Sequence, residues 1–190
     1  HQHTFYWSHM GWFTTPEGFR TDLDQVRDFA RFPELRFLDR FDVIGPVLLG
    51  VGLYCLGAWL EAVAPSLGTS AWQMVAWGFF VSTTILFHVT SLVNSAGHLT
   101  GSRRYATKDH SRNSLWLALL TFGEGWHNNH HHYPVSARQG FYWWEVDLSY
   151  YILRVMQVFG LVSNLRSVPA ETRAMTADVA ELEPEGDSRG

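Results

Sequence analysis

The stretch "AWQMVAWGFFVSTTILFHVTSLV", residues 71–93, is long and apolar enough to cross a lipid bilayer as a single helix. A second apolar stretch, "VIGPVLLGVGLYCLGAWL" at residues 43–60, precedes it, and the short segment between them contains a proline and a glycine. Two buried helices of a soluble protein would look similar, but a chain of 190 residues rarely buries two helices on all sides. The sequence therefore predicts an all-α integral membrane protein with a transmembrane helical hairpin, formed by residues of about 43–62 and 71–95.

The basic residues are distributed so that they give this hairpin an orientation. Between Arg40 and Arg103 the sequence contains no lysine and no arginine. Five arginines precede the first apolar stretch, and four basic residues follow the second. Cytoplasmic flanks of membrane helices carry an excess of lysine and arginine. We therefore expect a multi-pass protein with both termini on the cytoplasmic side and residues 61–70 on the opposite side.

The composition narrows the class of protein further. Aromatic residues make up 15% of the chain and include nine tryptophans, which favour membrane interfaces. The formal net charge of −4 gives no basic surface for nucleic acid, so no nucleic-acid partner is expected. The single cysteine, Cys55, excludes an internal disulfide and a cysteine-rich metal site. A lipid bilayer is the expected partner of the hairpin.

Segments outside the hairpin have the pattern of short amphipathic helices. Residues 21–41 mix arginines and acids with apolar residues at helical spacing, and Pro33 divides them into two helices. Residues 147–160 carry one apolar stripe. Such interfacial helices can lie along the lipid headgroups or pack on a cytoplasmic core, and the stripe alone does not decide. We expect one domain over residues 1–170 and a disordered acidic tail over residues 171–190.

The stretch "GEGWHNNHHHYP", which begins at Gly123, contains four histidines in six positions. His127, His130 and His131 have the spacing i, i+3 and i+4, so on a helix their imidazoles share one face. Imidazoles that converge in this way can bind zinc, copper, iron or nickel. A run of surface histidines without a metal is the alternative interpretation. The spacing favours a histidine-rich metal site.

Glu124 and His132, which flank the three histidines, are expected to have different roles. Glu124 lies three residues before His127 and would share the same helical face, where it could orient a ligating ring or bind the metal itself. His132 points away from that face, so we expect it to face solvent or to support the site indirectly. Glycines before the run and a proline after it predict a short, tightly positioned helix.

A second polar group lies at the cytoplasmic end of the second apolar stretch. In "NSAGH", Asn94 and His98 are four residues apart and share a helical face, which extends back through Ser91 to His88. Polar residues in a membrane helix usually face the protein interior. His98 could therefore meet the histidine cluster from a different helix, either as a ligand or as a hydrogen-bonding partner. For His88, which lies deeper in the hydrocarbon, we expect a packed histidine and not a ligand.

The N-terminal stretch "HQHTFYWSHMGW" adds three more histidines. His1, His3 and His9 could be ligands, but their spacing is irregular. His9 is embedded among aromatic residues, and His1 and His3 could simply begin a loop. The chain starts without a methionine, and we expect it to be the later part of a longer protein.

Four of these motifs together resemble the membrane fatty-acid desaturases, in particular those of the acyl-CoA (delta-9) type. "GEGWHNNHHHYP" is similar to the last histidine box of that family, and "NSAGH" is similar to its additional histidine motif after the fourth transmembrane helix. "FYWSHMGW" and "SARQGFYWWEVD" resemble the segments that follow the second and the last box. The motifs occur in the family's order from about Phe5 to Arg166, with two apolar helices where that order requires them.

This resemblance implies an enzyme, an oxidoreductase that uses two iron ions, O₂ and two electrons to introduce a double bond into an acyl chain. It implies an acyl-CoA or another acyl-lipid as the substrate, and a small cytochrome or a ferredoxin as the electron donor. The active site would lie on the cytoplasmic side of the membrane. The expected iron ligands are His98, His127, His130 and His131, with Asn94 bound through water or hydrogen-bonded to a ligand.

Two features depart from the family pattern. The first two histidine boxes, which precede the "SHMGW" segment in the family, are not among these residues. We therefore expect the chain to be the C-terminal part of a desaturase, to be inactive alone and to take up at most one metal ion. The basic pair that helps animal enzymes to bind coenzyme A is replaced by Pro16 and Glu17, which leaves the acyl carrier open.

Two other functions stay open at this point. A related membrane di-iron hydroxylase would use the same oxidant, but it would insert oxygen into the acyl chain or lipid. A non-catalytic membrane protein that binds one metal ion or none is compatible with the missing boxes. Two further histidine boxes upstream of these residues would exclude the non-catalytic alternative, and analysis of the product would separate a desaturase from a hydroxylase.

Overall fold

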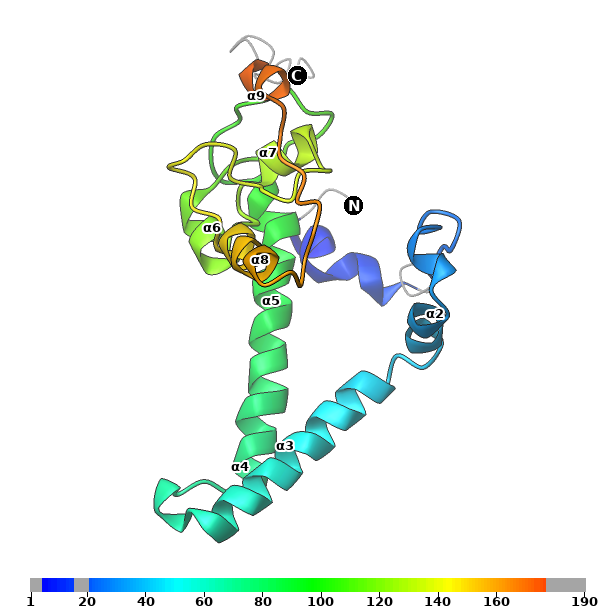
Figure 1. Cartoon of the computed structure of the whole chain (residues 1–190), viewed down its shortest axis with the longest axis vertical. Coiled ribbons are helices and arrows are strands. Elements are labelled where there is room, and N and C mark those ends of the chain that lie inside the picture. The colour runs from blue at the N-terminus through cyan, green and yellow to red at the C-terminus, as the bar shows by residue number, and fades with distance from the viewer. Residues whose placement is uncertain (1–4, 16–20, 177–190) are drawn as a thin grey trace, which may run out of the picture. The chain divides into compact units, whose positions relative to one another are not determined.

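The computed structural model shows a mostly helical chain (Figure 1). It describes residues 5–15 and 21–176, and every structural statement below refers to these residues. Within them there is no β-strand, and isolated bridges join Asn113 to Ser102 and to Trp126. The helical class expected from the sequence is therefore confirmed. His1, His3, Pro16 and Glu17 lie outside the described residues.

The chain divides into two compact units, and each is described by itself. The hairpin unit comprises residues 11–88. The site unit comprises residues 1–10 and 89–190.

Both apolar stretches are helices in the structure. α3 (Ile44–Val63) is 20 residues long, and the second helix extends over 28 residues from Ala71 to His98. Their mean hydropathies are 1.6 and 1.5, so both are long and apolar enough to cross a membrane by length and composition. The expected bounds, 43–62 and 71–95, differ from the observed ones only at the helix ends. The second helix consists of α4 (Ala71–Val75), a π-helical segment η5 (Ala76–Val81), α5 (Ser82–Ser95) and a 3₁₀ turn η6 (Ala96–His98).

A short connection closes the hairpin. A 3₁₀ turn, η4 (Pro65–Leu67), ends at Gly68, whose φ of 63° lies in the left-handed region that glycine adopts easily. Ser70 then caps the second helix, since its Oγ accepts a hydrogen bond from Gln73 N at 3.3 Å. In return, Ser70 N donates to Gln73 Oε1 at 2.8 Å. This capping box satisfies two backbone N–H groups that the start of a helix leaves unpaired.

The two helices of the hairpin touch through a glycine. A Cβ atom on Gly57 of α3 would lie 2.6 Å from Ala71 Cα and 2.9 Å from Ser70 O, so a side chain here would force the backbones apart. Small residues that let backbones approach are typical of helix contacts in membranes. Only 6% of the most apolar window of each helix is buried. The large apolar side chains are therefore left exposed, among them Leu48, Trp59, Trp72, Trp77, Phe80 and Leu86.

Residues 21–41 form two short helical elements. The first is a 3₁₀ turn, η3 (Phe29–Arg31), and the second is α2 (Pro33–Arg40). Pro33 separates them, as expected, and becomes the first residue of α2, where a missing N–H costs no helical hydrogen bond. The aromatic rings of Phe37 and Phe41 pack on each other at 4.9 Å between centroids, yet both side chains are exposed.

The site unit contains four further α-helices within the described residues, and they are connected by long loops. The buried carboxylate of Asp147 shapes the loop before α8 (Leu148–Val158), the third of these helices. Asp147 caps that helix, because its Oδ1 accepts a hydrogen bond from Tyr150 N at 2.9 Å. Its Oδ2 accepts one from Gln139 N at 2.7 Å. The four helices are α6 (Leu115–Leu120), α7 (His127–His132), α8 (Leu148–Val158) and α9 (Ala170–Ala174).

The interior of the site unit is unusually polar. Its buried apolar side chains include Tyr105, Leu117 and Phe141. Asn128, Asn129, Asn113, Glu145 and Asp147 are buried as well, along with several serines. Buried polar groups are stable only when they are hydrogen-bonded, so hydrogen bonds must define this interior.

The start of the expected acidic tail is packed against the site unit. Arg173 lies in α9, and its carbonyl oxygen accepts hydrogen bonds from Tyr105 Oη at 2.9 Å and Tyr142 Oη at 3.2 Å. The expected boundary at Glu171 therefore falls inside α9, which continues to Ala174. Residues 177–190 lie outside the described residues, so a disordered tail there stays a prediction.

Candidate metal centre

Three histidines from two separate segments meet in the site unit. His98 lies at the end of η6, and His127 and His131 lie on α7. One ring nitrogen from each lies within 4.8 Å of the other two, which makes them a group that could hold a metal ion. His98 Nε2 and His127 Nε2 are 3.0 Å apart. Two imidazole nitrogens bound to one ion at about 2.1 Å lie about 3 Å apart, so the His98–His127 pair of this three-histidine cluster has a spacing that fits a shared metal.

Burial keeps the central imidazole of the cluster neutral. His127 is 4% exposed, and burial together with the neighbouring His131 and His98 lowers its pKa to about 3. Burial and His131 also lower the pKa of His130. Only a neutral imidazole offers a lone pair to a metal. Both side chains are therefore ready to bind a metal ion at neutral pH.

His130 lies beside the three-histidine cluster but not within it. Its ring centroid is 5.6 Å from that of His131 and 6.2 Å from that of His127. The side chain is partly buried and lies on the same helix, α7. His130 thus lies on the same side of α7 as His127 and His131, while the group of converging nitrogens consists of His98, His127 and His131.

The opposite side of α7 is anchored by an asparagine. Asn128 is fully buried, and its Oδ1 accepts hydrogen bonds from Arg104 N at 2.9 Å and Tyr105 N at 2.8 Å. Its Nδ2 donates to Tyr105 O at 3.0 Å. One side chain thus replaces the backbone partners that residues 104–105 lack in their loop. This contact fixes the distance between α7 and that loop.

A second asparagine ties α7 to the loop before α8. Asn129 Nδ2 donates to Glu145 Oε2 at 2.9 Å, and Asn129 Oδ1 accepts from Asn113 Nδ2 at 2.7 Å. Glu145 is fully buried and also pairs with the guanidinium of Arg104. Its Oε2 accepts a further hydrogen bond from Tyr142 N at 3.1 Å. The histidines of α7 are therefore mounted on a buried network of amides and charges.

A carboxylate that sequence reasoning missed contacts the cluster directly. Asp109 Oδ2 accepts a hydrogen bond from His131 Nδ1. Burial would raise the pKa of Asp109, but hydrogen bonds from Ser111 and the nearby His131 hold it well below the usual value. The spacing of Asp109 and Ser111 is a signal for a side-chain-capped turn, which the sequence contains. Nothing in that local pattern points to a histidine 22 residues away.

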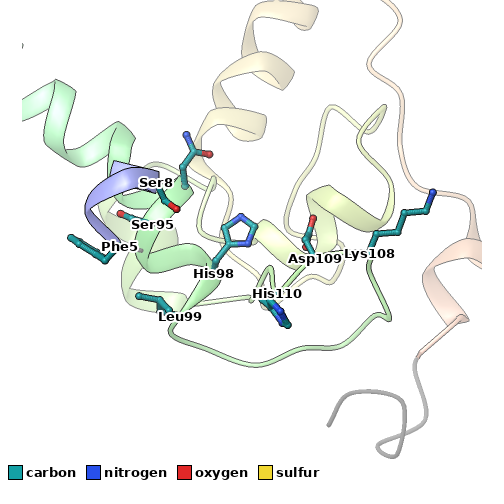
Figure 2. A pocket seen from close by; sticks show the side chains of 9 residues that line it. Phe5, Ser8, Ser95, His98, Leu99, Lys108, Asp109 and His110 are labelled. Atoms are coloured by element: carbon teal, nitrogen blue, oxygen red, sulfur yellow. The ribbon is translucent and has the colours of Figure 1, made fainter. Parts of the chain in front are cut away.

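A cavity of about 470 Å³ opens beside His98 (Figure 2). In Figure 2 the ring of His98 stands between Ser95 and Asp109, with Phe5 and Leu99 on the side of Ser95 and Lys108 on the side of Asp109. Asn94 also lines it and is exposed. The remaining lining residues are Ser8 and His110. The structure thus brings Asn94 and His98 to one cavity, as their shared helical face predicted.

Glu124 does not lie on the helix that carries the histidines. α7 begins at His127, and Glu124 belongs to the preceding turn, so the argument from a shared helical face does not hold. Burial, and then the carboxylate of Asp147, raise the pKa of Glu124. A role near the metal would therefore have to come from the turn, and it stays a prediction.

His132 and His9 lie outside the three-histidine cluster and make other contacts. The ring of His132 stacks on Tyr105 at 4.0 Å between centroids, and its Nε2 lies 3.0 Å from Thr172 O. His132 thus faces away from the metal side, as expected, and packs inside the unit. His9 Nδ1 lies 2.9 Å from Ser95 Oγ.

His88 lies on α5 within the hairpin unit, next to the ring of Phe87. In the part of the chain that the structure describes, the group that could hold a metal contains none of His9, His88 and His132.

These features define a helical protein with an apolar hairpin and a histidine-rich site that can hold a metal ion. Comparison with known proteins then gives the family. A family model described as fatty acid desaturase matches residues 1–160. The chain therefore belongs to the fatty acid desaturase family, which confirms the resemblance seen in its motifs.

The relatives found in this comparison are named as lipid desaturases. The chain is 39% identical to the sn-1 stearoyl-lipid 9-desaturase of Anabaena variabilis over 163 residues, which cover 85% of this chain and 55% of that protein. It is 38% identical to the same-named desaturase of Synechocystis sp. over 169 residues, 88% of this chain and 49% of that protein. A palmitoyl-monogalactosyldiacylglycerol delta-7 desaturase of Arabidopsis thaliana is 34% identical over 181 residues, which cover 92% of this chain and 45% of that protein. The chain spans about half the length of these relatives.

Proposed function

We propose that this chain contributes histidines to the di-iron centre of a membrane acyl-lipid desaturase. The observation that carries the proposal is the convergence of His98, His127 and His131 from two separate segments in a chain of the desaturase family. Neutral imidazoles are ligands that suit iron. The 3.0 Å between His98 Nε2 and His127 Nε2 also suits two ligands of one metal ion.

The histidines divide between two iron ions in this proposal. His98, His127 and His131 would hold one iron, because their nitrogens converge. His130 would hold the second, because it lies on the same side of α7 but its ring is set apart from the cluster. Asn94, at the cavity beside His98, would act through a water molecule or hydrogen-bond to a ligand. Glu124 would orient a ligand from the turn before α7.

The chemistry requires a redox metal because the methylene groups of an acyl chain are unactivated. Bound iron would supply the reaction with O₂ that removes hydrogen from them, which no acid–base pair of side chains can do. Two hydrogens of the acyl chain, two electrons and two protons then balance the reduction of O₂ to two molecules of water. The two electrons would come from a small cytochrome or a ferredoxin.

The substrate is proposed to be an acyl chain on a membrane lipid. The names of the relatives describe stearoyl-lipid and palmitoyl-lipid desaturases. The cavity beside His98 has apolar walls at Phe5 and Leu99, against which methylene groups can pack. Lys108 and His110 line the same cavity and can contact the polar part of a lipid. An acyl-lipid therefore replaces acyl-CoA as the preferred substrate class.

The membrane placement follows from the hairpin and the charges. α3 and the helix that ends at His98 would span the bilayer, since both are long, apolar and little buried. The arginines and lysine that flank them would put the histidines and both termini on the cytoplasmic side. There a soluble electron donor can reach the site.

The test is the fatty-acid profile of a host that expresses the complete reading frame encoding this chain. We expect a new monounsaturated acyl chain in the membrane lipids, and its loss in His98→Ala, His127→Ala, His130→Ala and His131→Ala. His132→Ala is the matched control, because its ring packs on Tyr105 away from the cluster, and most of the product should persist. A hydroxylated product, or equal loss in His132→Ala and His130→Ala, would contradict the proposal.

A further inference from the structure

We propose that Asp109 is a positioning residue that fixes the ring of His131, so that its Nε2 faces the metal. The proposal rests on the function proposed above and adds a residue to that site. Asp109 Oδ2 accepts the hydrogen bond from His131 Nδ1. A ring whose Nδ1 carries the shared proton has only Nε2 left as a lone pair for a metal.

His131 needs such a partner more than His127 does. His127 is 4% exposed, so the surrounding side chains restrict its ring. The side chain of His131 is 30% exposed, and an imidazole at the surface can turn about its last rotatable bond. A carboxylate on Nδ1 stops this rotation and selects one tautomer. Within the three-histidine cluster, burial thus fixes one ring and Asp109 fixes another.

Asp109 is itself held in place by a tight turn. Its Oδ1 accepts hydrogen bonds from Ser111 N at 2.9 Å and from Thr107 Oγ1 at 3.2 Å. With Oδ1 occupied in this way, Oδ2 is directed toward His131. A carboxylate that receives several hydrogen bonds stays ionised and keeps its orientation. The turn therefore presents one oxygen to the ring in a fixed direction.

The turn and the histidine helix also hold each other. Asn128, three residues before His131 on α7, donates through Nδ2 to Thr107 Oγ1 at 3.4 Å. Its Oδ1 binds the backbone N–H groups of Arg104 and Tyr105 at the start of the same loop. The contacts form a closed circuit from α7 through the loop to Asp109 and back to α7 at His131. The direction of the His131 ring thus depends on a loop that carries no metal ligand in this proposal.

The experiment uses the purified chain in detergent micelles and needs no catalytic turnover. Asp109→Ala removes the acceptor, and Asp109→Ser keeps a hydroxyl that can close the turn with Ser111 but is too short to reach His131. Asp109→Asn keeps the length of the side chain, but when its oxygen accepts from Ser111 N it turns an amide N–H toward His131 Nδ1. Glu171→Ala is the control, since Glu171 is an exposed carboxylate on α9 and does not line this cavity. Each protein is titrated with Co²⁺, whose visible absorption reports imidazole ligation.

The nitrogen resonances of ¹⁵N-labelled histidine are recorded separately without metal. In the parent chain we expect His131 protonated at Nδ1, and in Asp109→Asn we expect it protonated at Nε2, because Nδ1 must then accept from the amide. In Asp109→Ala and Asp109→Ser we expect a mixture of tautomers and a Co²⁺ affinity lower by about 10- to 100-fold, the usual effect of losing such a partner. Glu171→Ala should bind Co²⁺ within about twofold of the parent. A role confined to the fold would change stability without changing which nitrogen of His131 carries the proton.

The proposal and the function on which it rests can fail separately. If the parent chain binds no Co²⁺, the metal site is wrong, and the tautomer of His131 in the metal-free chain still decides the role of Asp109. If Asp109→Ala does not fold, as judged by its helical circular dichroism, Asp109→Ser gives the decision. Parent-like affinity and an unchanged His131 tautomer in the folded Ala or Ser variant overturn the proposal.

Discussion

The hairpin unit and the site unit place polar and apolar groups in opposite ways. In the hairpin unit, large side chains such as Trp72 and Leu86 are exposed, and the two helices touch through Gly57. In the site unit, Asn128 and Glu145 are buried completely. The contrast shows that a single rule for buried and exposed residues does not describe both units, and it is the arrangement expected if lipid surrounds the hairpin unit and water surrounds the site unit.

Each arrangement has its own physical reason. A helix satisfies its own backbone, so its side chains can all be apolar when the surrounding medium is apolar. The site unit has long loops, whose backbone groups need partners that regular structure does not supply. Buried asparagines and carboxylates fill that need, and they also aim the histidines. Exposed apolar side chains therefore characterise the hairpin unit, while buried hydrogen bonds hold the loops and histidines of the site unit in place.

The largest effect should follow from removing a buried charge of the site unit. Glu145→Ala leaves the guanidinium of Arg104 and the amide of Asn129 without their buried acceptor. Loss of one partner of a buried pair costs about 3–5 kcal/mol. We expect the free energy of unfolding of the site unit to fall by this amount, measured by urea titration of the near-ultraviolet circular dichroism. Glu171→Ala, at an exposed position, is the control and should change little. An equally small change for Glu145→Ala would show that the buried hydrogen-bond network does not stabilise the site unit.

A charge placed on the hairpin tests the opposite arrangement. Leu86 is 64% exposed and lies in the second apolar helix, so Leu86→Lys would be harmless if water surrounded it. Within a bilayer, a lysine near the centre of a helix costs about 3 kcal/mol relative to leucine. We expect a clear loss of membrane insertion in a glycosylation-mapping assay, with Leu86→Val as the control. Unchanged insertion of the lysine variant would mean that the exposed apolar surface of the hairpin does not face lipid.

The smallest of the three effects should come from the glycine contact within the hairpin. A Cβ on Gly57 would lie 2.6 Å from Ala71 Cα, so Gly57→Val must push α3 and α4 apart. Overpacking of this kind costs about 1–3 kcal/mol. We expect weaker cross-linking between cysteines placed across the two helices. Gly50→Val is the matched control, because no atom lies within 4 Å of its added Cβ. Equal cross-linking in both variants would show that the helices do not rely on this contact.

Much of the fold follows from local sequence patterns. The two apolar stretches predicted two helices, because length and the lack of charge are properties of a segment by itself. The spacing of His127, His130 and His131 predicted their common side on α7, since helical periodicity is also local. The polar stripe through Asn94 and His98 indicated that a second segment would reach the cluster. The contact of His98 with His127 depends on the fold, but the polar stripe had already identified His98 as a candidate.

The support of the site could not be predicted in the same way. Asparagine, glutamate and aspartate are mostly exposed in proteins, so the sequence gives no sign that Asn129, Glu145 or Asp147 are buried. Glu145 pairs with Arg104 across 41 residues, and no periodicity reports a partner at that distance. Asp109 could not be identified from the sequence for the same reason, because its partner His131 is 22 residues away. The role of these residues becomes visible only from their partners in the folded chain, and their neighbours in sequence do not indicate it.

Glu124 shows how a local pattern can mislead. Its spacing from His127 suggested a shared helical face, but Phe122 and Gly123 have φ angles of 59° and 127°. Left-handed backbone does not continue a right-handed helix, so Glu124 follows these residues in an irregular turn. Trp126, which lies between Glu124 and His127, has φ −79° and ψ 49°, and α7 begins only after it. At Gly123 a Cβ atom would also lie 2.4 Å from Asp147 Oδ1. The turn before α7 is therefore set by a contact with a distant carboxylate.

The long reach of the contacts in the site unit has a consequence for the order of folding during synthesis. Tyr105 and Arg173 are 68 residues apart, and His9 and Ser95 are 86 residues apart. Gly57 and Ala71, by comparison, are close in the chain. Contacts between distant residues form slowly, because a large loop must close before the contact can stabilise it. The hairpin can therefore assemble as soon as its second helix has left the ribosome, while the histidines receive their final support only after α9 has been made. We therefore expect the proposed metal to be bound late in the synthesis of the chain.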